Sequence, residues 1–123
     1  MRLLQVAQHV TDLARATAFY GDLLGAAPLA TYDPPGLVFF ALGDTRLLLE
    51  TGGTSGLVYL EVDDLDATLT RLRDQGVPVT TEAHRIFTHA DDALGPAGTE
   101  EWHAFVTDSE GNTVGLVELR PVP

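Results

Sequence analysis

The two stretches that decide the fold are Val10-Thr11-Asp12-Leu13 and Val62-Asp63-Asp64-Leu65, which repeat one pattern 52 residues apart. A short run with high β propensity precedes each stretch, at residues 3–10 and 57–62. After each stretch, apolar residues recur with the spacing of an amphipathic helix. Because an internal repeat of this kind indicates duplicated structure, we expect two successive strand–helix units.

Capping residues mark the ends of both predicted helices. Asp12 and Asp64 stand where a carboxylate can accept hydrogen bonds from the free amides of a first helical turn. Gly25 and Gly76 follow the last turns, where a left-handed glycine commonly ends a helix. The apolar face of the first helix holds Leu13, Ala16, Tyr20 and either Leu23 or Leu24, and that of the second holds Leu65, Leu69 and Leu72. Each helix is therefore expected to pack on a sheet.

Segments rich in Val, Phe, Leu and Thr follow each helix and predict strands. They span residues 36–42 and 45–50 in the first half, and 77–81, 101–107 and 113–119 in the second. Glycine-containing turns at 41–45 and 108–113 are expected to join consecutive antiparallel strands. Each half is thus predicted as a strand, a helix and a short meander.

The second half is longer than the first. The helices are offset by 52 residues, whereas Gly43 and Gly111, taken as equivalent turn glycines, are offset by 68. The 16 additional residues fall in the segment 83–101. We expect a loop there, and we expect chemistry specific to this protein to concentrate in it.

Composition limits the classes of function. The chain has 18 acidic and 7 basic residues, which gives a net charge of −11. All seven basic residues are arginine. Such a surface repels phosphate backbones and anionic lipids, so nucleic acid and membrane partners are not expected. The absence of cysteine excludes disulfides, thiolate nucleophiles and sulfur-ligated zinc. With 123 residues, 45% hydrophobic content and no visible signal peptide, we predict one cytoplasmic domain.

Two motifs resemble those of the vicinal oxygen chelate superfamily. Val10-x-Asp12-Leu13, followed by Ala18-Phe19-Tyr20-Gly21-Asp22-Leu23-Leu24-Gly25, resembles its first-helix signature. Asp108-Ser109-Glu110-Gly111-Asn112 is similar to its last hairpin turn. The resemblance implies an α+β fold of two tandem βαβββ modules, about residues 1–52 and 55–121, with curled mixed sheets around a cavity and a homodimeric assembly.

The resemblance alone does not choose an activity. Members of this superfamily include glyoxalase I, fosfomycin-modifying transferases, extradiol dioxygenases, acyl-CoA epimerases and bleomycin-binding resistance proteins. One fold therefore serves isomerases, transferases, oxygenases and binding proteins. Individual residues must decide among them.

Four positions would hold a divalent ion in metal-dependent relatives, and the resemblance places them at Gln5, Leu47, Leu57 and Gly115. Only Gln5 offers a ligand atom, whereas such a site normally needs at least three protein ligands. Glu50 and Glu118 each lie three residues beyond an expected position, an odd step that turns a side chain to the other face of a strand. We therefore predict no metal ion and no cofactor, and we assign no catalytic residue.

Candidate ligand contacts come from strand alternation. Gln5 and His9 share one face of the first strand, and Tyr59 and Glu61 share the matching face in the second module. Since this face lines the cavity in relatives, all four are candidate contacts, although His9 and Glu61 could instead reach solvent at the strand ends. Trp102 is either a stacking wall for a planar or cationic ligand or a core residue.

Three histidines lie in or beside the additional segment: His84, His89 and His103. Imidazoles near carboxylates such as Glu101 could form a relocated metal site or an acid–base pair, and the alternative is a polar surface loop. His84 and His89 are five residues apart, which matches neither one face of a strand nor the helical His-Glu-x-x-His motif. We retain His84 as a candidate ligand contact.

Three functions follow from these observations. The first is a small-molecule-binding protein without the usual metal site, similar to the bleomycin-resistance branch, whose acidic surface favours a cationic or aromatic ligand. The second is a metal-dependent lyase, isomerase or dioxygenase that combines Gln5 with His or Glu from the additional segment. The third is an interaction domain without a ligand. We favour the first.

Overall fold

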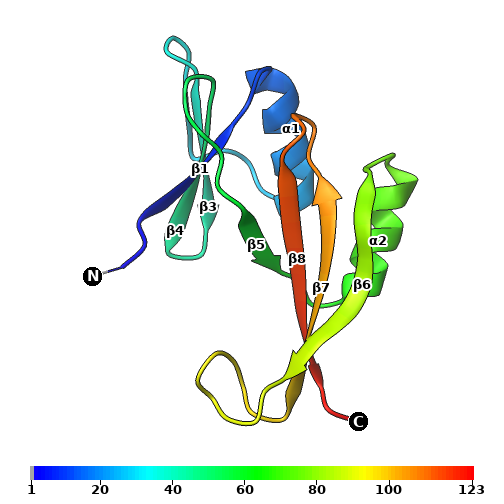
Figure 1. Cartoon of the computed structure of the whole chain (residues 1–123). Helices are drawn as coiled ribbons and strands as arrows, with labels where there is room; N and C mark the ends of the chain where they lie inside the picture. Colours follow the sequence, from blue (N-terminus) through cyan, green and yellow to red (C-terminus); the bar gives the residue numbers. More distant parts are fainter. Residues whose placement is uncertain (1) are drawn as a thin grey trace. The chain divides into compact units, whose positions relative to one another are not determined.

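The structure is a computed structural model of the chain, which describes residues 2–123 (Figure 1). The chain forms two compact units. Unit 1 contains the residues up to Leu57 together with residues 108–112, and unit 2 contains residues 58–107 and 113–123. The expectation that the whole chain is a single domain stays a prediction. No helix of the described residues is long and apolar enough to cross a membrane.

Unit 1 is a βαβββ module. Its elements are β1 (Gln5–His9), α1 (Leu13–Leu24), β2 (Ala30–Tyr32), β3 (Leu37–Leu42) and β4 (Thr45–Glu50). The sheet has the order β1-β4-β3-β2, with β1 parallel to β4 and the other pairs antiparallel. Strand β2 was not expected, because three residues are too few to show an alternating pattern.

Unit 2 repeats this topology. Its elements are β5 (Val58–Glu61), α2 (Leu65–Asp74), β6 (Val79–Thr88), β7 (Thr99–Thr107) and β8 (Thr113–Pro121). The sheet has the order β5-β8-β7-β6, with β5 parallel to β8. The predicted α+β fold with two similar βαβββ modules is therefore confirmed.

Both helices begin at the expected caps. The Asp12 carboxylate accepts a hydrogen bond of 3.0 Å from the Arg15 amide, and the Asp64 carboxylate accepts one of 3.0 Å from the Ala67 amide. Helix α1 ends at Gly25, whose φ of 63° is left-handed. The sequence thus predicted both ends of α1 and the start of α2, whose C-cap is Gln75, one residue before Gly76.

Each helix covers one face of its own sheet. The buried side chains between α1 and its sheet include Ala16, Tyr20, Val38, Phe40, Leu47 and Leu49. Those between α2 and its sheet include Leu65, Leu69, Leu72, Ala104, Val106, Val114 and Leu116. Burying one such large apolar side chain stabilises the fold by roughly 1.5–3 kcal/mol. The opposite face of each sheet carries no helix of its own unit, and we call it the open face.

About half of the additional segment is strand, so the prediction of a loop over residues 83–101 was wrong in extent. Strands β6 and β7 extend into a long hairpin, and the connecting loop covers only residues 89–98 (Figure 1). Most side chains of β6 are exposed, and its register with β7 shifts at three points. An exposed, bulged strand lacks the apolar alternation that identifies strands in a sequence.

Candidate functional site

The open face of unit 2 carries a cluster of aromatic rings. Strand pairing sets Tyr59 beside Gly115 and Gly115 beside Phe105, so all three positions share this face. The Tyr59 ring centre lies 5.5 Å from that of the His103 imidazole and 5.9 Å from that of Phe105. Tyr59 is 50% exposed and can still contact a ligand.

Gly115 occupies the position where metal-dependent relatives are expected to have a carboxylate that binds the metal ion. In this chain the Tyr59 and Phe105 rings occupy the space beside it. A Cβ atom on Gly115 would lie 2.7 Å from Cδ1 of Tyr59 and 3.2 Å from Cε1 of Phe105. A side chain at this position would therefore displace the Tyr59 ring.

Glu118 faces away from this cluster, as the sequence predicted. It pairs with Trp102, one position out of phase with Gly115 and Phe105 along the two strands. Its Oε1 accepts a 2.6 Å hydrogen bond from the Leu65 amide, at the start of α2. The Glu118 carboxylate thus belongs to the helix-covered face.

The open face of unit 1 holds Gln5 and His9, together with Glu50. Oε1 of Gln5 accepts a 3.1 Å hydrogen bond from Nε of Arg46, its neighbour across the strands. A guanidinium therefore occupies the one amide oxygen that was predicted as a possible metal ligand. The Nδ1 atom of His9 is buried and has no hydrogen-bond partner within residues 2–123.

Two sequence predictions about β4 were wrong in register. Leu47 lies fully buried on the face that α1 covers. The residue of unit 1 that corresponds to Gly115 is Leu48. Leu48 pairs with Ala7 in the first sheet, as Gly115 pairs with Tyr59 in the second. The error arose because turns of unequal length were aligned on their glycines. Leucine at either position offers no ligand atom.

The same shift changes the position of Glu50. It pairs with His9 and so lies on the open face with Gln5, not on the opposite face as expected. Its carboxylate folds back onto Gly53, where an added Cβ atom would overlap Oε1. Glu50 is four residues along β4 from Arg46, the partner of Gln5. At the usual rise per residue of a strand, this is a distance of about 13 Å.

A carboxylate bonded to two imidazoles lies on the hairpin of unit 2. Oε1 of Glu101 is 3.0 Å from Nε2 of His89, and Oε2 of Glu101 is 2.6 Å from Nε2 of His103. The side-chain exposures are 19% for Glu101, 2% for His89 and 14% for His103. The structure thus brings together three of the residues considered for a relocated site.

The members of this cluster are joined by hydrogen bonds. Within residues 2–123, no three His, Asp or Glu side chains are placed to hold a metal ion. Each Nε2 atom is bonded to a different oxygen of the Glu101 carboxylate. The arrangement is that of an imidazole oriented by a carboxylate.

Trp102 lies apart from the aromatic cluster, whereas His84 pairs with His103 across β6 and β7. Trp102 pairs with Glu118 and so faces the helix-covered side, where the Arg120 guanidinium lies 4.2 Å from its ring centre. A cation from the same unit therefore already stacks on this indole. His84 is exposed, and its Nδ1 lies 2.9 Å from the Glu82 carbonyl oxygen.

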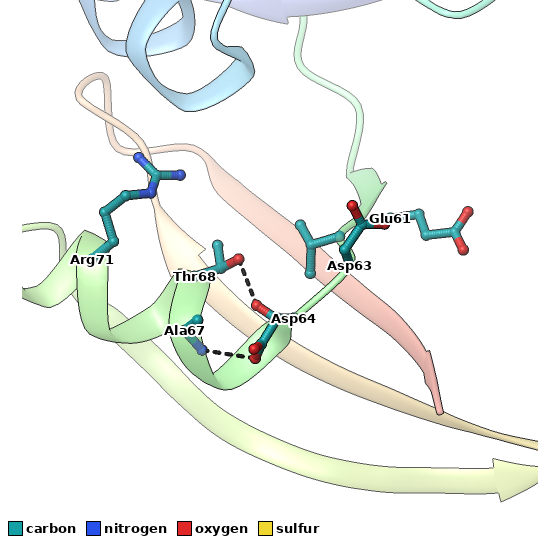
Figure 2. A pocket seen from close by; sticks show the side chains of 7 residues that line it. Glu61, Asp63, Asp64, Ala67, Thr68 and Arg71 are labelled. Carbon is teal, nitrogen blue, oxygen red and sulfur yellow. Dashed lines mark hydrogen bonds between the residues drawn. The ribbon is translucent and has the colours of Figure 1, made fainter. Parts of the chain in front are cut away.

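Glu61 borders a groove beside the start of α2 (Figure 2). The groove has a volume of about 460 Å³ and is lined by Glu61, Val62, Asp63, Asp64, Ala67, Thr68 and Arg71. Figure 2 shows Glu61 and Arg71 at its two ends and Asp64 between them. The Asp64 carboxylate caps the helix, and its carbonyl oxygen accepts a 2.7 Å hydrogen bond from the Thr68 hydroxyl.

The sequence did not reveal the role of Glu110 in unit 1. Its carboxylate accepts hydrogen bonds of 2.8 Å from the amides of Thr11 and Asp12, and of 2.7 Å from Nε of Arg15. The Arg15 guanidinium and these amides hold the pKa of Glu110 well below its ordinary value of 4.5, against the opposing effect of burial. Glu110 therefore anchors the turn at residues 108–112 to the start of α1.

Tandem βαβββ modules, each with a helix on one face of its sheet, are the architecture that the resemblance to the vicinal oxygen chelate superfamily implies. The chain belongs to the Glyoxalase/Bleomycin resistance protein/Dioxygenase superfamily, whose family profile matches residues 2–116.

Named relatives within this superfamily differ in activity. The chain is 30% identical to a lactoylglutathione lyase of Salmonella typhimurium over 138 aligned positions, which cover 98% of this chain and 94% of that protein. A lactoylglutathione lyase structure from Agrobacterium tumefaciens aligns with a TM-score of 0.71 and 26% identity, over 95% and 92% of the two chains. TnmS3 from Streptomyces sp. CB03234, an antibiotic binding protein, aligns with a TM-score of 0.69 and 25% identity, over 97% and 96%.

Proposed function

We propose that this chain is a small-molecule-binding member of the superfamily that works without the divalent-metal site of its metal-dependent relatives. The observation that carries the proposal is the Tyr59 ring lying over Gly115. A position that would hold a carboxylate ligand has no side chain, and an aromatic ring takes the space. The two residues together replace a metal ligand with a surface for an aromatic molecule.

The other expected ligand positions support the same proposal. Leu48 and Leu57 have no ligand atoms, and the amide oxygen of Gln5 is bonded to the Arg46 guanidinium. Among these positions only Gln5 offers a donor atom to a divalent ion, and this atom already accepts a hydrogen bond from the positively charged Arg46. A divalent ion normally needs three or more donor atoms from the protein. The residues present do not fit the metal ion.

The proposed ligand is an aromatic molecule, preferably a cationic one. The net charge of −11 favours cations over anions, and the aromatic rings of the open face offer stacking surfaces. TnmS3 shows that a relative at 25% identity is an antibiotic binding protein. A homodimer in the cytoplasm, expected from the sequence, is part of this proposal.

A thermal-shift experiment with three matched probes tests this function. N-methylacridinium is a planar cation, acridine is its neutral parent and acridine-9-carboxylate is an anionic analogue. We expect the cation to raise the Tm most and the anion least, since a ligand that binds only the folded state at 100 times its Kd stabilises it by about 2.7 kcal/mol. An unchanged Tm with all three probes would contradict the proposal.

The competing function is a metal-dependent lyase, isomerase or dioxygenase, and the lactoylglutathione lyases among the relatives favour it. In that function, His89, Glu101 and His103 are the best candidates for metal ligands away from the usual positions. Titration with Zn²⁺, Ni²⁺, Mn²⁺ and Fe²⁺ separates the two functions. Stoichiometric binding that is lost in His103→Phe would support the metal-dependent enzyme and count against the metal-free binding protein.

A further inference from the structure

We propose that His103 is the hydrogen-bond acceptor through which unit 2 recognises a planar aromatic ligand that carries an O–H or N–H group. This inference rests on the proposed binding function and adds the chemistry of recognition. It is carried by the hydrogen bonds around Glu101 and by the rings around His103.

The hydrogen bonds of Glu101 determine where the His103 imidazole carries its proton. An ionised carboxylate has acceptors only, so both imidazole nitrogens that contact Glu101 must donate. The proton of neutral His103 is therefore on Nε2, 2.6 Å from Oε2 of Glu101. Its Nδ1 atom then has a free lone pair.

The Nδ1 lone pair of His103 is available to a ligand. No residue in the described part of the chain donates a hydrogen bond to this atom, and the atom is not among the buried ones that lack a partner. An imidazole that donates to a carboxylate is also a stronger acceptor at its other nitrogen. Nδ1 of His103 is thus an oriented acceptor on the open face.

His89 is a positioning residue for this acceptor. Its side chain is 2% exposed and lies against the Phe87 ring, with 4.5 Å between the ring centres. On another side it meets Gly95, where a Cβ atom would be 2.8 Å from Cε1 of the imidazole. A buried polar ring in such a tight position costs free energy unless it is hydrogen-bonded, and its bond to Oε1 fixes the Glu101 carboxylate. Oε2 of Glu101 is then directed at His103.

Aromatic rings flank the acceptor. The Tyr59 ring is inclined by 53° to the His103 ring, and the Phe105 ring by 85°. A planar molecule that contacts the half-exposed Tyr59 ring can bring an edge donor to His103. Because Glu101 supplies a negative charge behind the imidazole, donors on neutral or cationic molecules are preferred to anions.

Two matched probes test the role of His103. The first is 2-naphthol, which has a planar ring system and one O–H donor, and the second is 2-methoxynaphthalene, which has the same rings and no donor. We expect 2-naphthol to bind about fivefold more tightly, the equivalent of one net neutral hydrogen bond. The ¹⁵N signals of the histidine side chains are recorded during both titrations.

The free protein should show His103 protonated at Nε2, and only 2-naphthol should shift its Nδ1 signal. In His103→Phe the ring is kept and the acceptor is lost, so both probes should bind equally. Gln75→Ala removes an exposed polar side chain that follows α2, and it should leave the fivefold preference intact. Glu101→Gln and His89→Phe should reduce the preference, because each loosens the orientation of His103.

The possible failures are distinguishable. Equal binding of both probes to the wild type, with signals of Tyr59 and Phe105 perturbed, would overturn the role of His103 and leave the binding function standing. A preference for 2-naphthol that survives in His103→Phe would also overturn it. Should that variant fail to fold, the Nδ1 signal of the wild type decides alone. The absence of any perturbation by either probe on the open face would overturn both proposals.

Discussion

Gly115 and Tyr59 are the residues on which the proposed function depends most, because together they close the position where a metal ligand would stand. The glycine is required by packing and not by its backbone, since its φ is not in the left-handed region. The sequence alone showed that Gly115 lacks the carboxylate of metal-dependent relatives. It did not predict that the Tyr59 ring contacts Gly115, because contact between neighbouring strands depends on a register that only the folded sheet defines.

Substitution of Gly115 tests this packing. Gly115→Ala should destabilise the protein by about 1–3 kcal/mol, because the new Cβ overlaps the Tyr59 ring. Gly52→Ala is the matched control, since a Cβ there meets nothing within 4 Å. The free energy of unfolding is measured by urea denaturation. The penalty should shrink when Gly115→Ala is combined with Tyr59→Ala, and an undiminished penalty would contradict the proposed contact.

Glu110 provides a test that depends on pH. Its pKa is lower in the folded state than its ordinary value of 4.5, so it stabilises the fold above that pH and loses this contribution as the pH falls below it. Glu110→Gln should therefore cost about 1.5–3 kcal/mol near neutral pH, the range for hydrogen bonds to a charged group. Urea denaturation of both proteins should show the difference narrowing well below pH 4.5. A difference that stays constant with pH would exclude this role.

At the scale of elements, the sequence predicted what local patterns determine. Asp12, Asp64 and Gly25 located the helix ends, since capping needs only neighbouring backbone groups. Only the distal part of the hairpin of β6 and β7, within residues 83–101, was predicted as a loop, because exposed and bulged strands are held by their neighbours and not by their own pattern. The cluster of Glu101 with two histidines follows from that long-range pairing, so the sequence could suggest its members but not join them.

Glu118 tests the assignment of the two sheet faces in unit 2. Glu118→Ala should destabilise the fold by about 1–3 kcal/mol, because the Leu65 amide loses its acceptor at the start of α2. It should leave the Kd of N-methylacridinium unchanged, since this carboxylate lies on the helix-covered face. Circular dichroism and a fluorescence titration measure the two effects. Loss of ligand binding in a folded Glu118→Ala protein would place Glu118 in the site and contradict the assignment.

At the scale of the whole molecule, the net charge of −11 acts on any charged ligand. Its effect on association is long-range and weakens as salt shortens the screening length, which is about 10 Å at 0.1 M. Net charge was readable from the sequence, because it needs no knowledge of contacts. The family could be predicted from motifs, whereas the proposal of a metal-free binding protein rests also on the side-chain geometry of the open faces.

Ionic strength should therefore separate the matched probes. The Kd of N-methylacridinium should rise as sodium chloride is added, while that of neutral acridine should change little, because only the cation is attracted by the acidic surface. Fluorescence titrations at several salt concentrations provide the measurement. The same salt dependence for both probes would show that net charge does not select the ligand.

Ligand binding without a metal ion is tested most directly by calorimetric titration of N-methylacridinium into the purified chain. The titration is made once after treatment with EDTA, and again after removal of EDTA and addition of equimolar Zn²⁺ or Ni²⁺. We predict the same Kd in each case, because Gly115, Leu48 and Leu57 provide no ligand atoms and Gln5 is engaged by Arg46. Binding that disappears with EDTA and returns only with the metal ion would contradict a metal-free function.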